Sequence, residues 1–475
     1  MRQPKGLFIL SGTEMWERFS FYTLSAILAL FMVEVLHFDM AFASLIFGLI
    51  TASTYVLQIL GGYLSDNYIG NRKAIYIGGI LMMIGQLIIA LSASLYASSA
   101  NIPTHSSFIF TTQENIFIIG AIVLALGSGF FKVNISSLVG LLYEENDSRL
   151  DVAYTIFYMA INVGGLIAPI IAAIVVGDGH PELFQYGFLI AGISLGLRLL
   201  MFTLFKDKHV VSPTGVPIGV IATAKDKELL TQRKTNSTGA KLTKIEIDRI
   251  YVILLLSLMA IIFFIGFEQR STSILFFIKQ SVNTVIPIMN VTVSPEFFLL
   301  LNPLAIIILA PIFVEIWLFL NRRNKEPSVV TKMGIGLIIL ALSYVVLGIG
   351  FSIVENSAVK LALTWIIVFN LLQSIAELLI SPIGLSLVTK LAPIKYTSSF
   401  MGVWFVAMAL AEFLAGYFAG FYPESTKHVV KYLFDFIPID NLVSFAGIFI
   451  GMSLIFGILC LIFRNKIIKL MHGIK

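Results

Sequence analysis

Long apolar segments alternate with short polar ones along this chain, and most of the apolar segments reach the roughly 20 residues that an α-helix needs to cross a bilayer. The first set lies at about 7–34, 41–64, 73–97, 115–142, 152–176 and 184–204. The second set lies at about 250–278, 296–320, 332–353, 359–389, 397–421 and 441–463. Residues 279–295 form a semi-apolar connector. The pattern predicts an all-α polytopic membrane protein with 12 transmembrane helices in two sets of six.

One long polar stretch, residues 206–249, separates the two sets and has no room for a further pair of spans. We therefore expect an N-terminal six-helix bundle (1–205), a cytoplasmic linker (206–249) and a C-terminal six-helix bundle (250–475). Two helical halves joined by a cytoplasmic loop are the layout of major facilitator transporters, whose sites lie at the midplane between the halves.

The loop GGYLSDNYIGNRKA (61–74) agrees with this layout. It resembles the G-x-L-a-D-x-x-G-R-[KR] signature of that superfamily through Gly62, Asp66, Gly70, Arg72 and Lys73. The glycines would allow close helix contact, and Asp66 could cap a helix or pair with a basic residue at an inner gate.

The composition excludes most soluble classes. Of 475 residues, 58% are hydrophobic and 12% charged, whereas soluble domains carry about 25% charged residues. The single cysteine, Cys460, cannot form an intrachain disulfide, and no CxxC or Cys/His cluster is present to hold a metal. With no nucleophile–base pair or phosphate loop either, an enzyme is not expected.

The Lys and Arg residues predict the orientation. Most of them fall in the termini and loops on the N-terminal side of the membrane, and the opposite loops hold only Lys279, Lys360, Lys427 and Lys431. The positive-inside rule then places both termini in the cytoplasm, as for an integral protein of the plasma (inner) membrane. The net charge of +5 is thus a topology signal, and no nucleic-acid partner is expected. The N-terminus MRQPKG runs straight into the first span, so no cleavable signal peptide is expected.

The first span contains unexpected charges in the stretch GTEMWERFSFY (12–22). Charged side chains in hydrocarbon cost several kcal/mol each. Positions 14, 17, 18, 21, 22 and 25 share one helix face, so this face should line water or protein. The alternative is a local ion pair between Glu14 and Arg18, which leaves Glu17 unexplained.

Further polar side chains lie within other spans. These are Lys132 in GSGFFKVNISS, Glu268 and Arg270 in FIGFEQRSTS, and Glu377 in NLLQSIAELLISPIG. Arg198 lies within a turn or two of the expected cytoplasmic end of its helix, so its side chain could reach the interface. The deep acids outnumber the deep bases, and carboxylates in a low dielectric keep protons more readily. A cavity with a positive and a negative end suits protons and a zwitterion.

At this point the chain resembles the proton-dependent oligopeptide transporter family. Residues 14–22, EMWERFSFY, fit the family motif E-x-x-E-R-F-x-Y-Y, and FYMAINVGGLIAP (157–169) resembles its fifth-helix signature. GFFKVNISSLVG, LLLNPLAIIILAP (299–311), ELLISPIGLSLVTKLAP (377–393) and FMGVWF (400–405) resemble signatures of the fourth, eighth, tenth and eleventh helices. The similarity runs from Pro4 to about residue 420.

The resemblance implies import of di- and tripeptides with protons as the coupling ion, no other cofactor, and a monomer in the lipid bilayer. It assigns the peptide carboxylate to Arg18, Tyr22 and Lys132, and the peptide ammonium to Asn162, Asn302 and Glu377. Tyr55, Trp404 and Ser381 would form pocket walls. Glu14, Glu17 and Glu268 would carry protons, and Lys132 with Glu377 would form a salt bridge at the inner gate.

The chain departs from the family pattern at three places. Ser25 stands where relatives usually have an arginine that pairs with the seventh-helix glutamate, here Glu268. Arg270 could replace that charge, but residues two apart point to different faces, so this needs a rotated helix or a water bridge. Phe21 replaces the first tyrosine of the motif. The two extra helices that many bacterial relatives insert between the halves are missing.

Other functions stay open. The substrate could be another small zwitterion or anion, such as an amino-acid conjugate or nitrate, although Glu377 disfavours nitrate because an anion has no use for a buried carboxylate. The chain could also be a nutrient receptor that no longer transports, for which the Ser25 change is the supporting feature.

Overall fold

The computed structural model describes residues 3–96, 104–144, 149–177, 180–220, 243–286, 291–357, 359–381, 388, 391–392, 397–423, 430–433 and 435–473. Half of the predicted linker and about half of the segment 377–393 therefore lie outside the described residues.

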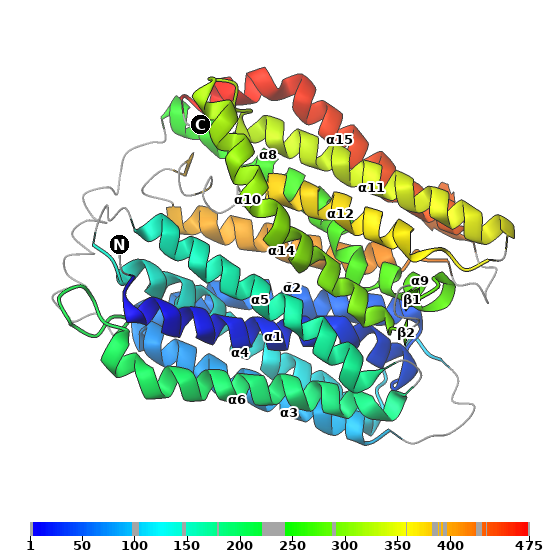
Figure 1. The fold of residues 1–475 in the computed structure, drawn as a ribbon, viewed down its shortest axis with the longest axis horizontal. Coiled ribbons are helices and arrows are strands. Elements are labelled where there is room, and N and C mark those ends of the chain that lie inside the picture. The colour runs from blue at the N-terminus through cyan, green and yellow to red at the C-terminus, as the bar shows by residue number, and fades with distance from the viewer. Residues whose placement is uncertain are drawn as a thin grey trace. The chain divides into compact units, whose positions relative to one another are not determined.

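Among the described residues, six long helices form the first half of the chain (Figure 1). They are α1 (Lys5–Glu34), α2 (Met40–Leu64), α3 (Asn71–Ser94), α4 (Thr112–Leu141), α5 (Leu150–Val176) and α6 (Phe184–His209). A π-helical turn, η1 (Ser65–Ile69), follows α2, and a 3₁₀ turn, η2 (Pro181–Leu183), precedes α6.

The second half is again helical, with two short hairpins. Its helices are α8 (Lys244–Phe267), α9 (Ser273–Ser281), α10 (Leu301–Arg322), α11 (Val329–Ser357), α12 (Leu363–Ile380), α14 (Thr397–Ala419) and α15 (Leu442–Leu470). The 3₁₀ turns η3 (Glu268–Ser271) and η4 (Pro295–Leu300) precede α9 and α10. Strand β1 (Val285–Ile286) pairs with β2 (Val291–Thr292), and β3 (Lys431–Leu433) pairs with β4 (Ile437–Ile439), both antiparallel.

The prediction of an all-α polytopic membrane protein is confirmed. Within the described residues, 11 helices are long and apolar enough to cross a membrane. Helix α1 is equally long, at 30 residues, but it carries Glu14, Glu17 and Arg18 in its middle. Each predicted span overlaps one of these helices.

Two predicted helix ends differ from the structure for local reasons. Helix α8 begins at Lys244, six residues before the predicted start at 250, because Thr243 and Glu246 form a capping box there. Helix α6 continues past 204 to His209, since Lys206, Lys208 and His209 interact favourably with the negative end of the helix dipole.

The helices pack into two compact units. Unit 1 comprises Met1–Glu228 with Val293–Pro303, and unit 2 comprises Leu229–Thr292 with Leu304–Lys475. In unit 1, α3 packs against α4 and α6, and α1 packs against α5 and α6 (Figure 1). In unit 2, α11 packs against α12 and α15, and α8 packs against α14.

Helices α3 and α4 approach to backbone contact because glycines face the neighbouring helix. A Cβ on Gly85 would lie 2.5 Å from the backbone nitrogen of Leu124, and one on Gly127 would lie 2.5 Å from that of Met82. Small residues permit such close packing where lipid supplies no hydrophobic driving force between helices.

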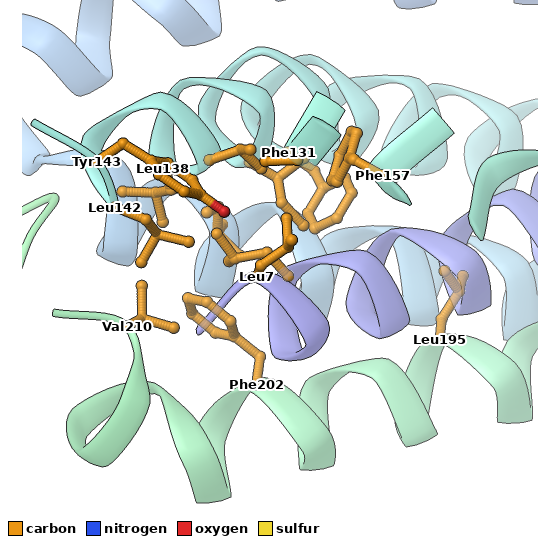
Figure 2. Close-up of a cluster of buried hydrophobic side chains, with 14 of the residues drawn as sticks. Leu7, Phe131, Leu138, Leu142, Tyr143, Phe157, Leu195, Phe202 and Val210 are labelled. Carbon is orange, nitrogen blue, oxygen red and sulfur yellow. The ribbon is translucent and has the colours of Figure 1, made fainter. Parts of the chain in front are cut away.

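One end of unit 1 is closed by a cluster of buried apolar side chains (Figure 2). Leu7 of α1 lies between Leu138 of α4 and Phe202 of α6 in this cluster, with Leu142 and Val210 beside them. The cluster therefore ties the start of α1 to the ends of α4 and α6, and it fixes the depth at which the charges of α1 lie in the unit.

Candidate substrate and proton site

The charged residues of α1 form one buried ion cluster. Glu14, Glu17 and Arg18 are 3%, 0% and 6% exposed. Arg18 Nε lies 3.2 Å from Glu14 Oε1 and donates a hydrogen bond to Glu17 Oε2. One guanidinium thus serves both carboxylates, so the alternative of a closed Glu14–Arg18 pair is incomplete. The cluster is buried in protein, which is how α1 avoids the cost of these charges in lipid.

Two glycines of α5 bring that helix onto the charged part of α1. A Cβ on Gly164 would lie 2.5 Å from the backbone oxygen of Met15, and one on Gly165 would lie 2.9 Å from the Tyr22 ring. Arg18 also stacks on Phe21, with its guanidinium carbon 4.8 Å from the ring centre. The small residues of the 157–169 segment therefore position Arg18 and Tyr22.

Lys132 joins this group from α4. Its ammonium lies 4.6 Å from the centre of the Tyr55 ring of α2, and it interacts electrostatically with Glu14. Asn162 of α5 is buried, and its side-chain amide donates to the carbonyl of Tyr158 at 2.9 Å. Unit 1 thus brings together residues that the sequence analysis assigned to the peptide carboxylate and to protons.

Beside Ser25 lies a small cavity of about 20 Å³ whose lining is mainly apolar. Side chains of Ser20, Ser25, Thr51, Thr54 and Ser128 line part of it. The short side chain of Ser25 leaves this space open within unit 1.

The expectation that Arg198 reaches the interface is wrong. Its side chain is 1% exposed, and its guanidinium carbon stands 3.9 Å from the centre of the Phe131 ring. Because α6 extends to His209, Arg198 lies about three turns from the helix end, which is too far for its side chain to leave the protein. The burial of Arg198 could have been inferred from its distance to the end of the apolar helix, had that end been placed at His209.

In unit 2, Glu268 and Arg270 lie in the 3₁₀ turn between α8 and α9. Arg270 Nη2 lies 3.6 Å from Glu268 Oε1, and the guanidinium carbon stands 3.9 Å from the centre of the Phe267 ring. Two residues that are two positions apart would point to different faces of an α-helix. Here α8 ends before Glu268 and a 3₁₀ turn follows, so the arginine side chain can lie over Phe267 and still approach Glu268.

The other predicted site residues lie on or next to α10, α12 and α14. Trp404 of α14 and Asn302 of α10 are buried, Glu377 of α12 is half-buried, and Ser381 at the end of α12 is exposed. Ser381 follows the helix and its backbone nitrogen donates to the carbonyl of Glu377 at 2.8 Å. The salt bridge between Lys132 and Glu377 would join residues of different units, and it stays a prediction.

The described part of the site consists of buried ion pairs rather than of metal ligands. Within the described residues, no group of three or more His, Cys, Asp or Glu side chains could hold a metal ion. Buried carboxylates paired with guanidinium groups can instead exchange protons and partners, and lysine and arginine can bind a carboxylate from a guest molecule.

The chain is similar in sequence to members of a known transporter family. The sequence profile of the POT family, PTR2, matches residues 72–214 and 220–434. A dipeptide and tripeptide permease B from Xenorhabdus bovienii is 31% identical, over 88% of this chain and 87% of its own. A dipeptide and tripeptide permease A from Escherichia coli is 30% identical, over 88% of this chain and 84% of its own.

Solved structures agree with the sequence comparison. A crystal structure of a mutant POT peptide transporter in complex with alafosfalin has a TM-score of 0.80 at 27% identity, covering 99% of this chain and 96% of that one. The profile match spans well over half of the residues. The chain therefore belongs to the POT family of proton-dependent oligopeptide transporters in the major facilitator superfamily, which are membrane transporters and not enzymes.

Proposed function

We propose that this protein imports di- and tripeptides together with protons. Relatives at 30% and 31% identity are named dipeptide and tripeptide permeases, which supports this substrate class. The observation that carries the proposal is the grouping in unit 1 of Glu14, Glu17 and Arg18 with Lys132. It combines carboxylates that can take protons with cations that can bind a peptide carboxylate.

The proposed recognition uses the parts that all short peptides share. Arg18, Tyr22 and Lys132 would bind the carboxylate, and Asn162, Asn302 and Glu377 would bind the ammonium group. Charge-assisted hydrogen bonds to these ends are strong in a partly dry site. Tyr55, Trp404 and Ser381 would then contact variable side chains without selecting strongly among them.

The proposed cycle links protons to the substrate. Proton binding to Glu14, Glu17 or Glu268 would favour loading from the outside. After release of peptide and proton to the inside, Lys132 and Glu377 would pair again and reset the transporter. Each half of the cycle changes the partners of ionised groups, which is how a proton gradient can drive a rocking of two bundles.

Uptake of a labelled dipeptide into proteoliposomes, with and without an inward proton gradient, tests the proposal. We expect accumulation only with the gradient, and competition by unlabelled di- and tripeptides but not by nitrate. Equal uptake without the gradient would contradict proton coupling. Gradient-driven uptake of a labelled amino-acid conjugate or nitrate in place of the dipeptide would identify another substrate, and no uptake of any of them would favour a receptor.

A further inference from the structure

The side chain of Arg198 is enclosed by three helices of unit 1. Its own helix is α6; Phe131 of α4 lies under its guanidinium at 3.9 Å, and Met82 Sδ of α3 lies 3.5 Å from Nη1. Gly79 of α3 leaves room for the group, because a Cβ there would lie 2.7 Å from Nη2. The side chain is thus held in a defined position, and the aromatic face favours its positive charge.

This pocket does not supply a negative charge. Among the described residues, Arg198 Nη2 has no hydrogen-bond partner, and the thioether and the aromatic ring are neutral. A buried ion without a counter-charge is strongly unfavourable. The charge of Arg198 must therefore be balanced from outside its immediate contacts.

The two buried carboxylates of α1, Glu14 and Glu17, each have an oxygen that lacks a hydrogen-bond partner among the described residues. Arg18 occupies one oxygen of each, and in the described structure Glu14 Oε2 and Glu17 Oε1 have no hydrogen-bond partner. The charged groups that act on Arg198 are Glu17, Glu14 and Arg18, and those that act on Glu14 also include Lys132 of α4. When all four are ionised, Glu14, Glu17, Arg18 and Arg198 together carry no net charge, and Lys132 adds one positive charge beside them.

We propose that Arg198 is a positioning residue of the proton-coupling cluster and supplies the second positive charge that balances ionised Glu14 and Glu17. Uptake of one proton by either carboxylate then leaves the cluster with a net positive charge beside Lys132. That charge attracts a substrate carboxylate, so proton binding and substrate binding favour each other. The link to transport rests on the proposed function, whereas the charge balance does not.

The first test measures the charge balance without transport, as the Tm of the purified full-length protein against pH. R198M replaces the arginine by an unbranched, uncharged side chain of similar length. K208Q is the matched control, because it removes an exposed charge from the same helix. We expect R198M to have a lower Tm than the wild type. The difference at neutral pH should be at least about twice the difference at acidic pH, because protonated carboxylates need no counter-charge. K208Q should show no pH-dependent deficit.

Two further variants separate charge from packing. R198K keeps the charge and should keep the wild-type pH dependence, and E17Q/R198M, which removes one charge of each sign, should recover most of the lost Tm. If R198M gives no folded protein, recovery in both of these variants still supports the proposal. A decrease in the Tm of R198M that is the same at all pH values would overturn the proposal. So would decreases in the Tm of R198K and of E17Q/R198M that equal that of R198M.

The second test is the pH profile of dipeptide uptake in proteoliposomes. Removal of a positive charge favours the protonated carboxylates, so the midpoint for R198M should move by about one pH unit toward higher pH, and that for R198K should stay. An unchanged profile in R198M would overturn the role in coupling. If the wild-type protein shows no gradient-driven uptake, the proposed function fails, but the Tm measurements still decide the charge balance.

Discussion

At the scale of single residues, Arg270 offers a direct test of how this chain handles the charge of Glu268. The two side chains lie 3.6 Å apart, and loss of the guanidinium would leave the carboxylate without its cation. We expect R270A to lower gradient-driven dipeptide uptake about tenfold, the equivalent of about 1.4 kcal/mol. Uptake at acidic and neutral external pH, with and without the gradient, measures this.

Arg323 provides the matched control. It also stacks on an aromatic ring, with its guanidinium carbon 4.1 Å from the centre of the Phe319 ring, but it is exposed at the end of α10. R323A should transport normally. If R270A also transports with normal proton coupling while E268Q does not, Arg270 does not replace the missing cation at position 25.

The residue scale also shows what could be predicted from the sequence and what could not. The grouping of Glu14, Glu17 and Arg18 on one face follows from helical periodicity, and Lys132 stood out because a lysine in an apolar helix needs a partner. Arg198 was misplaced because its depth depends on where α6 ends. Its contact with Phe131 is set by the packing of three helices, which a single sequence does not reveal.

At the scale of helices, the contact between α1 and α5 limits what position 164 can hold. A Cβ on Gly164 would lie 2.5 Å from the backbone oxygen of Met15, and backbone cannot move aside as a side chain can. We expect G164A to destabilise the protein by about 1–3 kcal/mol and to reduce uptake, because Arg18 is carried on the displaced helix. Thermal unfolding in detergent measures the first effect.

Gly447 of α15 serves as the comparison, since no described atom outside the adjoining turns of its own helix lies within 4 Å of a Cβ built there. G447A should leave the Tm unchanged or raise it slightly, because alanine favours a helix over glycine by about 1 kcal/mol. Equal behaviour of G164A and G447A would show that α1 and α5 are not in such close contact.

A second prediction for the helices concerns Arg72, at the start of α3. Its Nε donates to the carbonyl of Ile218 at 2.6 Å and its Nη1 to Asp207 Oδ1 at 2.9 Å. These bonds hold the segment after α6 against the start of α3. Within that segment, Ser212 N donates to the carbonyl of Val216 at 2.8 Å. We expect R72A to raise hydrogen exchange at the Ser212 amide by about tenfold or more, since bonds to charged groups contribute about 1.5–3 kcal/mol each.

The neighbouring Lys73 is exposed, so K73A should leave the exchange of the Ser212 amide unchanged. Unaltered exchange in R72A would mean that the segment is held by its own turn alone. The sequence identifies the basic pair only as part of a superfamily signature and as a topology signal. Its contacts with Ile218 and Asp207 could not be predicted, because they depend on how the chain turns after α6.

At the scale of the whole molecule, the spans were predictable because each must be apolar over a bilayer thickness. Changes of helix type within them were not, such as the 3₁₀ turn at Glu268–Ser271 and the π turn at Ser65–Ile69, since both depend on tertiary packing. The division of the chain at 1–205, 206–249 and 250–475 stays a prediction, because half of the middle segment lies outside the described residues.

The orientation in the membrane is the last prediction, and α11 makes it testable. This helix has 29 residues, or about 44 Å at 1.5 Å per residue, which exceeds the roughly 30 Å hydrocarbon core. Lys325 before it and Lys360 after it are both exposed, and a crossing of the membrane by α11 would place them on opposite sides. The excess of basic residues on the side of Lys325 predicts that this side is cytoplasmic.

Labelling of introduced cysteines with a membrane-impermeant maleimide can decide this. The native Cys460 is 3% exposed and donates to the carbonyl of Val330 at 3.3 Å, so C460A gives a background that should fold and remain unlabelled. In that background, K360C should react on intact cells, and K325C should react only after the membrane is opened. The reverse pattern would place both termini outside, and labelling of both on intact cells would mean that α11 does not span the membrane.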